Sequence, residues 1–514
     1  MNRWSALALL LALAGALALR VPKLDTRPLH NDEAVNAVKV SELWQHGRYA
    51  YDPDEYHGPA LHYATLPFLC LSGARNGDDL DDATLRLAPV ACGVGLIFLL
   101  LLFADGLGRP ALVWSATFIA VSPAMVFYSR YFIHEMPLIF FTALTLGAGW
   151  RYAQTHSVRW AVVAGVGLGL MWATKETFVI TLAAMVLAGI ATAWWTAPKD
   201  ARIPSLLAFW NWKHAALAMT AALLIWLVLF SSFFTNAAGL LDSARTYLPW
   251  LKRAGGHSPH LHSWSFYLER LAWFHPAKGP VWSEGLILVL AVVGTVVSLV
   301  GKKSPLLRFL ALYTIILTAL YSAISYKTPW CLLNFYLGMI LLAGVGAVAL
   351  VEFFRARAWR GVILAVLLGL TMQLSWQAWR ASFVYAADRR NPYVYAQTVP
   401  DLLKLVQRAE GLARVAPAGY ETVVKIIAPQ SDYWPLPWYL RRFKHLGWYE
   451  SLPENPFPSI VIVSSKLDAR LDEKSDRKWI MAGLTELRPG VFFELYVELE
   501  LWKRYVATLP RDPE

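Results

Sequence analysis

Two adjacent carboxylates near the start of the chain are the first residues that could do chemistry. Asp32 and Glu33 lie in a polar stretch that follows an apolar segment, 4–19. A carboxylate held at a membrane surface loses hydration, which raises its pKa and lets it act as a general base. The alternative is structural, because Asn31 or Asp32 can cap a helix that runs to about Gln45. The residues alone leave both interpretations open.

A second polar group directly precedes Pro137. The group contains an acidic residue, Glu135, with His134 beside it, and a cationic residue, Arg130, a few positions earlier. No denser ligand pattern accompanies the pair, so no cofactor is firmly indicated. Arg130 and Tyr131 are candidate substrate contacts. The alternative is an interfacial anchor, since Arg and Tyr are common at headgroup level and a proline can begin a helix.

Two lysines occupy short turns between apolar runs. Lys175 and Glu176 separate two such runs, where charges are costly and often functional. Lys327 precedes Trp330 in a turn where an ammonium suits a lipid phosphate and an aromatic ring suits a prenyl chain or a sugar. The alternatives are an ion pair that reaches the headgroups and a snorkelling lysine beside an aromatic belt.

Two further groups of residues favour ordinary structural roles. The segment 234–283 contains four histidines whose spacing matches no metal motif, which favours a loop near the substrate. Four aromatic residues in the C-terminal part are able to stack on sugars, but such residues more often form the core of a small domain. The residues are His257, His260, His262 and His275 in the loop, and Trp434, Trp438, Tyr439 and Trp448 in the C-terminal part.

The elements that must position these residues are apolar segments of membrane-spanning length. Hydrophobic residues make up 57% of the 514 residues and charged residues only 16%, whereas soluble domains carry about 25% charged residues. We therefore expect an α-helical polytopic membrane protein with about eleven transmembrane helices. The expected helices are 4–19, 84–105, 110–128, 137–153, 160–174, 177–196, 214–233, 284–300, 306–323, 331–351 and 361–378.

The distribution of charge predicts the orientation of these helices. With the N-terminus in the cytoplasm every inside loop is basic, as the positive-inside rule requires. The C-terminus is then extracytoplasmic, and the protein belongs to the plasma or inner membrane. The run Ala60–Ser72 is expected to be an interfacial helix, because one more span would reverse the alternation. The first segment is expected to remain as an uncleaved helix. Basic residues of the inside loops include Arg109, Arg151, Lys199, Lys302 and Arg355.

The composition excludes several other classes of protein. The net charge is +11, but the basic residues lie in short loops and form no face or stripe, so we expect a bilayer and no nucleic acid as the partner. The chain contains three cysteines, Cys70, Cys92 and Cys331, and all lie in apolar stretches. A disulfide framework is therefore excluded.

The chain divides into a membrane part and a C-terminal domain. The membrane part is 1–379, and its outer loop 20–83 carries the Asp-Glu pair. Residues 380–514 hold 36 of the 83 charged residues and read as a small extracytoplasmic α/β domain. Strands are predicted at 422–428, 459–464 and 490–501, and helices at 391–409, 432–445 and 473–483.

Several short motifs resemble the glycosyltransferase-C superfamily, which includes protein O-mannosyltransferases and lipid A aminoarabinose transferases. More closely, the chain resembles the family of flippase-activity-associated proteins of archaeal N-glycosylation and its bacterial relatives. The motifs follow the same order along most of the chain. They are His30-Asn31-Asp32-Glu33-Ala34, Tyr56-His57-Gly58-Pro59, Ser129-Arg130-Tyr131, Glu135-Met136-Pro137, Lys175-Glu176, Tyr326-Lys327-Thr328-Pro329-Trp330, Ser431-Asp432-Tyr433-Trp434-Pro435 and Trp438-Tyr439.

The resemblance implies a membrane glycosyltransferase that takes a sugar from a polyprenyl phosphate and transfers it to a glycan, lipid or protein acceptor on the outer face. Asp32 would be the general base of an inverting reaction, with Glu33 beside it. Glu135 would complete the catalytic site or, with His134, help to hold a divalent metal ion. His57, Arg130, Tyr131, Lys175, Lys327 and Trp330 would contact the substrate. The alternative is a non-enzymatic flippase, or its accessory, for lipid-linked sugars. Transporters often contain repeated halves with broken helices, and no such repeat is visible.

Overall fold

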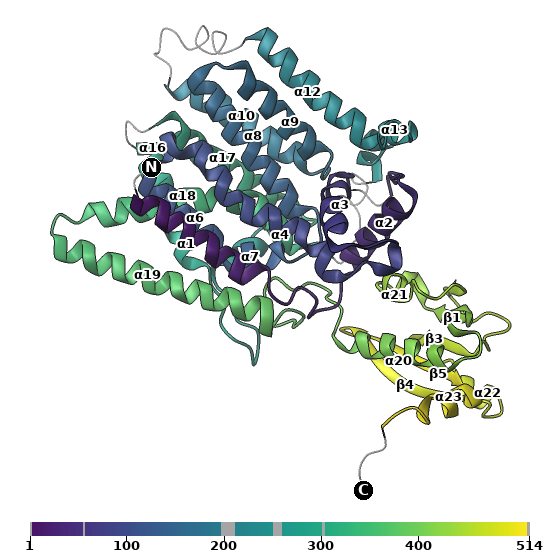
Figure 1. The fold of residues 1–514 in the computed structure, drawn as a ribbon. Coiled ribbons are helices and arrows are strands. Elements are labelled where there is room, and N and C mark those ends of the chain that lie inside the picture. The colour runs from purple at the N-terminus through teal and green to yellow at the C-terminus, as the bar shows by residue number, and fades with distance from the viewer. Residues whose placement is uncertain (1–2, 55–56, 197–210, 250–259, 301–303, 511–514) are drawn as a thin grey trace.

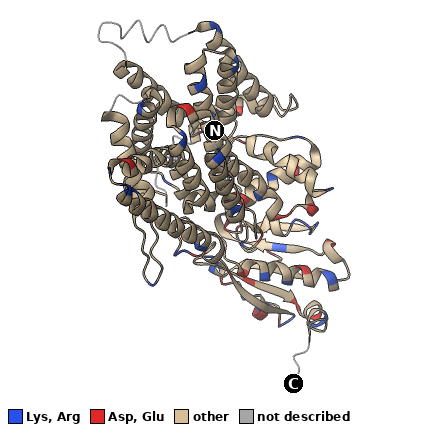
Figure 2. Ribbon diagram, turned by 60° about the vertical axis from the view of Figure 1, so that its left-hand side comes forward, with Lys and Arg blue, Asp and Glu red and all other residues tan. Residues whose placement is uncertain are grey.

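The computed structural model describes the chain except for residues 1–2, 55–56, 197–210, 250–259, 301–303 and 511–514. Tyr56, Lys199, His257 and Lys302 therefore lie outside the described residues. A bundle of helices forms the larger part of the molecule, and a small α/β domain lies at one end of it (Figure 1). Charged side chains concentrate in the loops and in the C-terminal domain (Figure 2).

Each predicted apolar segment overlaps a helix of the bundle. Within the described residues, seven helices are long and apolar enough to cross a membrane, or eight if the bent pair α6 and α7 counts as one span. The number eleven therefore stays a prediction. The segments correspond to α1 (Arg3–Arg20), α4 (Asp82–Leu99) with η2 (Leu100–Phe103) and α5 (Ala104–Leu107), α6 (Arg109–Val121) with α7 (Pro123–Ser129), α8 (Glu135–Thr155), α9 (Val158–Trp172), α10 (Phe178–Thr196), α12 (Trp212–Phe230), α16 (Gly285–Val300), α17 (Pro305–Ala323), α18 (Leu333–Phe353) and α19 (Arg357–Trp379).

Small residues let two of these helices approach closely. A Cβ atom on Gly294 of α16 would lie 1.9 Å from the carbonyl oxygen of Leu342 in α18. A Cβ atom on Gly346 of α18 would lie equally close to the carbonyl oxygen of Leu290 in α16. Because lipid tails are as apolar as the helices, close van der Waals contact of this kind holds membrane helices together.

A buried arginine ties the first helix to the bent pair. Arg20, the last residue of α1, is fully buried. Its guanidinium donates to the carbonyl oxygens of Ile119 and Ala120, at 2.6 and 2.9 Å, and to Oγ of Ser129 at 3.0 Å. The two carbonyls lie in the last turn of α6, just before the 57° bend into α7, and Ser129 is the last residue of α7. The bend frees backbone carbonyls, and the guanidinium satisfies them.

Two short helices form the outer loop that carries the Asp-Glu pair. They are α2 (Asn31–His46) and α3 (Ala60–Ser72), and α3 has the bounds predicted for the interfacial helix. The N-cap of α2 is His30, not Asn31 or Asp32 as predicted. The His30 side chain accepts from the amide of Asp32, and the Glu33 side chain accepts from the amide of His30. This reciprocal arrangement is a capping box.

The C-terminal domain contains one mixed five-stranded sheet in the order β2-β1-β3-β5-β4. The three strands β2, β1 and β3 are parallel, and β5 is antiparallel to β3 and β4. Alternate residues of the central strands face opposite sides, so that Ile426 and Ile462 pack in one core and Ile427 and Val463 in another. The strands are β1 (Val424–Ile427), β2 (Leu446–Tyr449), β3 (Ile460–Ser464), β4 (Trp479–Arg488) and β5 (Val491–Glu498).

The predicted strands of this domain are confirmed, but the predicted helices are shifted or wrong. The helix predicted at 391–409 is α20 (Asp401–Val415), and the one at 432–445 is reduced to α21 (Leu436–Tyr439). The helix predicted at 473–483 is wrong, because α22 (Leu471–Lys474) ends early and β4 follows. Pairing with β5 determines the conformation there and overrides the local pattern.

Candidate active site

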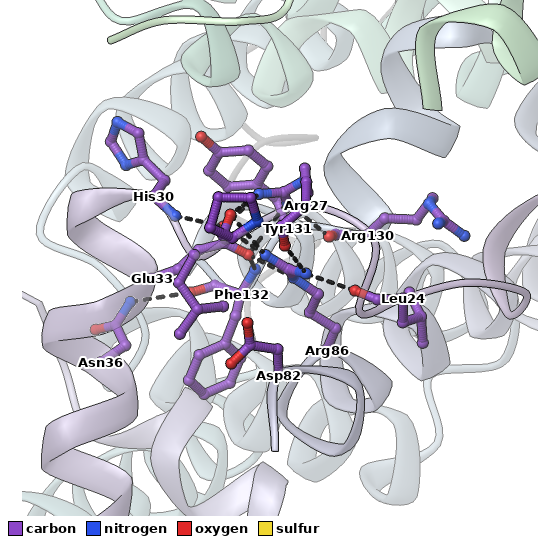
Figure 3. A network of polar contacts seen from close by, with 12 residues as sticks. Leu24, Arg27, His30, Glu33, Asn36, Asp82, Arg86, Arg130, Tyr131 and Phe132 are labelled. Carbon is purple, nitrogen blue, oxygen red and sulfur yellow. Dashed lines mark hydrogen bonds and ion pairs between the residues drawn. The ribbon is translucent and has the colours of Figure 1, made fainter. Parts of the chain in front are cut away.

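Glu33 is the centre of a buried polar network in the outer loop (Figure 3). Its carboxylate is fully buried between two guanidinium groups. Arg27 donates to Oε2 at 2.5 Å and to Oε1 at 3.1 Å, while Arg86 donates to the same two oxygens at 3.0 and 2.9 Å. The backbone N–H groups of His30 and Phe132 donate to it as well, at 2.9 and 2.8 Å. Glu33 therefore holds three separate segments together.

This environment makes Glu33 a poor proton acceptor. Burial alone would raise the pKa of the carboxyl, but the charges of Arg27 and Arg86 outweigh burial and hold that pKa well below its usual range. Six N–H donors also occupy its oxygens. We therefore assign Glu33, predicted with the catalytic residues, to the support of the loop.

Arg130 and Tyr131 contribute to the same support. Arg130 donates to the carbonyl oxygens of Arg20, Pro22 and Lys23, each at 2.7 Å, and so closes the turn that follows α1. The Tyr131 ring lies 4.2 Å from the Arg27 guanidinium, which is a cation–π contact. Its hydroxyl donates to Gln397. Both residues were predicted as substrate contacts, and here their polar groups bind protein.

Asp32 has a very different environment from its neighbour Glu33. Its side chain is 39% exposed, and one of its oxygens lies 3.8 Å from Nδ1 of His30. Successive residues of a helix point about 100° apart, which is why one carboxylate enters the core and the other does not. Burial lowers the pKa of His30 despite the nearby carboxylates, so its ring is neutral and its Nδ1 accepts from the Asp32 amide.

A strip of aromatic rings connects this position to the predicted Lys327 turn. The Trp330 ring centroid lies 5.7 Å from that of His30 and 6.0 Å from that of Tyr395. The Tyr395 hydroxyl meets Nδ1 of His260 at 2.6 Å, and the amide of Lys327 donates to the His260 carbonyl at 2.8 Å. Aromatic faces of this kind bind apolar chains and sugar rings. The structure thus brings two predicted site regions together.

Lys327 lies in the turn that leads to Trp330, one ring of this strip. Its ammonium donates to the carbonyl oxygens of Ile324 and His262. Burial lowers the pKa of Lys327. An ammonium has three N–H donors, so two carbonyl contacts leave one donor for another ligand.

The remaining predicted residues form a separate cluster where three outer turns meet. Lys175 forms a buried ion pair with Glu135, and His57 contacts Glu176 through Nδ1 at 3.1 Å. The His134 ring lies 4.8 Å from that of His57. Burial would lower the pKa of Lys175, but the charge of Glu135 outweighs it and raises that pKa, so the lysine stays charged. The cluster therefore contains one buried ion pair, Lys175 with Glu135, and one imidazole–carboxylate contact, His57 with Glu176.

The two predicted metal ligands have different surroundings. Glu135 forms an ion pair with Lys175, and Nε2 of His134 contacts the carbonyl oxygen of Gly58 at 3.1 Å, while Nδ1 of His134 is buried without a hydrogen-bond partner. Over the described residues, no group of three or more His, Cys, Asp or Glu side chains is placed to hold an ion. Metal binding by this pair therefore stays a prediction.

The aromatic residues of the C-terminal domain have structural roles. Trp438 is buried and its indole donates to Asp82 at 2.8 Å. The Tyr439 hydroxyl donates to the other oxygen of Asp82 at 2.6 Å. Trp448 packs on Tyr433 with ring centroids 4.6 Å apart. Trp448 thus packs against the core of the C-terminal domain, as expected, whereas Trp438 packs against α2 and α3 of the membrane part.

The sequence reasoning missed three charged residues of the network. Arg27 and Arg86 form ion pairs with Glu33, and Asp82 accepts a hydrogen bond from Trp438 of the C-terminal domain. Arg86 lies inside a predicted span, 84–105, where a charge is costly unless it has a partner. That cost was the signal from which a buried acidic partner could have been inferred.

Comparisons with known proteins show which family and which solved structures this chain is similar to. Residues 67–241, about a third of the chain, match the family described as dolichyl-phosphate-mannose-protein mannosyltransferase. No curated protein sequence matches the chain.

Two solved structures share the fold. ArnT from Cupriavidus metallidurans, solved bound to undecaprenyl phosphate, is 16% identical with a TM-score of 0.61, over 99% of each chain. The Archaeoglobus fulgidus oligosaccharyltransferase, tethered to an acceptor peptide, is 13% identical with a TM-score of 0.55, over 87% of this chain and 64% of that one. The protein is therefore an integral membrane protein with the glycosyltransferase-C fold, and its residues 67–241 carry the match to the mannosyltransferase family.

Proposed function

We propose that the protein transfers a sugar from a polyprenyl phosphate to an acceptor hydroxyl on the outer face of the membrane, with Asp32 as the general base. The observation that carries the proposal is the contrast between Asp32, half-exposed beside the aromatic strip, and Glu33, which is fully engaged below it. The fold supports a lipid-linked donor, because ArnT of this fold was solved with undecaprenyl phosphate bound.

The reaction balances with one base. The acceptor oxygen forms a bond to the anomeric carbon while the bond from that carbon to the phosphate oxygen breaks. Asp32 takes the proton of the acceptor hydroxyl, and polyprenyl phosphate leaves with the electron pair. Attack opposite the leaving phosphate inverts the anomeric carbon. A positioned base of this kind contributes roughly 10²–10⁴-fold to the rate.

The aromatic strip and Lys327 supply the donor site in this proposal. Trp330 and His30 are buried and back the site, and the half-buried ring of Tyr395 is the part of the strip that would meet the sugar or the first prenyl units. The remaining N–H of Lys327 is available to a phosphate oxygen. The cluster around Lys175 and Glu135 would support the acceptor side from the adjacent turns.

The decisive experiment distinguishes transfer from transport. The purified protein is incubated with a polyprenyl-phosphate sugar in detergent and, separately, in sealed vesicles. Our proposal requires cleavage of the sugar–phosphate bond in both preparations. Movement of intact lipid across the vesicle membrane without any cleavage would instead identify a flippase and overturn the proposal.

The outward orientation of the site is a separate part of the proposal. In a variant whose three cysteines are replaced, a cysteine at Ser465 in the C-terminal domain should react with an impermeant thiol reagent from outside the cell. A cysteine at Ser157, between α8 and α9, should react only after permeabilisation. Labelling of Ser157 from outside would reverse the orientation.

A further inference from the structure

The C-terminal domain touches the backbone directly before the proposed base. The amide of Leu29 donates to the Tyr439 hydroxyl at 2.7 Å. The carbonyl oxygen of Leu29 accepts from the Thr398 hydroxyl at 2.8 Å. Leu29 is fully buried, so no water can replace these partners. Both polar groups of one residue, three positions before Asp32, are thus held by the C-terminal segment.

The preceding residue is held by the same segment. The side-chain amide of Gln397 donates to the carbonyl oxygen of Pro28 at 3.2 Å. Its oxygen accepts from the Tyr131 hydroxyl at 2.6 Å, which couples this contact to the network below Glu33. The polypeptide that enters α2 therefore lies between the membrane part and the C-terminal domain, with hydrogen bonds on both sides.

The direction of the Tyr439 contacts is fixed. Asp82 can only accept, so the Tyr439 hydroxyl donates to it, at 2.6 Å, and must accept from Leu29. Burial and the charge of Asp82 raise the pKa of Tyr439, so the hydroxyl keeps its proton. One phenol thus connects the start of α4 to the segment that leads into the base.

We propose that the C-terminal domain sets the position of the catalytic loop, with Tyr439 as the positioning residue for Asp32. This inference rests on the proposed function. It gives the soluble domain a part in the reaction that does not require contact with the substrate. A shift of about 1 Å in a catalytic group is enough to slow a reaction about 10²-fold. Loss of the buried hydrogen bonds that hold the loop should therefore change the rate measurably.

The test variant is Tyr439→Phe, which keeps the ring between the two cores and removes only the hydroxyl. We expect kcat for sugar transfer to fall about tenfold, the effect of losing one buried hydrogen bond to a charged network. KM for the donor should change less than twofold, and protein level should stay the same. The matched control is Tyr505→Phe in the same domain, which should keep full activity.

A double variant separates positioning from stability. If Tyr439 acts through Asp32, adding Tyr439→Phe to Asp32→Asn should not reduce the residual transfer further. If Tyr439→Phe lowers the protein level, Thr398→Val provides the second measurement, because it removes only the contact to the Leu29 carbonyl. Unchanged kcat in a folded Tyr439→Phe protein, or full additivity with Asp32→Asn, would overturn the inference. Full activity of Asp32→Asn alone would instead refute the base, so the two failures are distinguishable.

Discussion

Asp32 and Glu33 are adjacent in the chain, yet they belong to two different regions. Glu33 lies in a closed network where two guanidinium groups and two backbone amides occupy its oxygens. Asp32 lies beside the aromatic strip, next to the His30 ring, and is 39% exposed. A carboxylate with every acceptor position filled maintains geometry, whereas one with free lone pairs can take a proton. Under our proposal, two neighbouring residues of the motif thus divide the work: Glu33 supports the loop and Asp32 is the reactive group.

The largest expected effect lies on the open side. Asp32→Asn keeps the size of the side chain, and its protein level should match that of the parent because Asp32 holds no buried partner. Sugar transfer should fall roughly 10²–10⁴-fold, measured as product formed per mole of folded enzyme. Asp54→Asn, an exposed change in the same outer loop, is the control. A fully active Asp32→Asn protein would show that Asp32 is not the base and so does not differ from Glu33 in catalysis.

The closed side should respond in stability. Glu33→Gln leaves two buried guanidinium groups without a counter-charge and should cost about 3–5 kcal/mol of unfolding free energy. The measurement is denaturant unfolding in detergent together with the membrane level of the variant. Glu42→Gln, on the exposed face of the same helix, should change little. A stable Glu33→Gln protein with reduced turnover would show that Glu33 takes part in the reaction rather than in support of the loop.

The ion pair of Lys175 and Glu135 offers a smaller test of the same distinction. Lys175→Met strands one buried carboxylate and should cost about 2–3 kcal/mol. The double variant Lys175→Met with Glu135→Leu removes both charges and should regain most of that loss. Thermal unfolding in detergent measures both, and Lys404→Met in an exposed pair is the control. If the double variant is stable but inactive, the pair has a role beyond structure.

The smallest effect is expected at the turn beside His57. A Cβ atom on Gly58 would lie 2.2 Å from the carbonyl oxygen of Ala173. Gly58→Ala should therefore cost about 1–3 kcal/mol through displacement of the turn. Gly361→Ala, where a Cβ atom meets nothing within 4 Å, is the matched control in the unfolding measurement. Equal stability of the two variants would show that the turns move apart without cost.

The sequence predicted the positions of the helices better than the tertiary contacts between side chains. Apolar runs predicted helices across the bundle, and the bounds of Ala60–Ser72 agree with α3. The partners of Glu33 were not predictable from local patterns, because Arg86 lies 53 residues away and no periodicity links the two. Likewise, a helix was predicted at 473–483, where β4 begins, because the pairing of β4 with β5 cannot be inferred from the residues of that segment alone. Candidate residues were identified by type, but which of them are engaged and which are open depends on tertiary contacts.

The buried contact of Arg20 has a consequence for the order of folding during synthesis. Its carbonyl partners in Ile119 and Ala120 lie 99 and 100 residues further along the chain. The guanidinium can therefore form these hydrogen bonds only after that stretch has left the ribosome. Until then, it must be hydrated or paired with lipid headgroups. The first helix enters the membrane early but reaches its final packing only when the bent pair arrives. Folding of this bundle thus begins with an element whose last contact forms late.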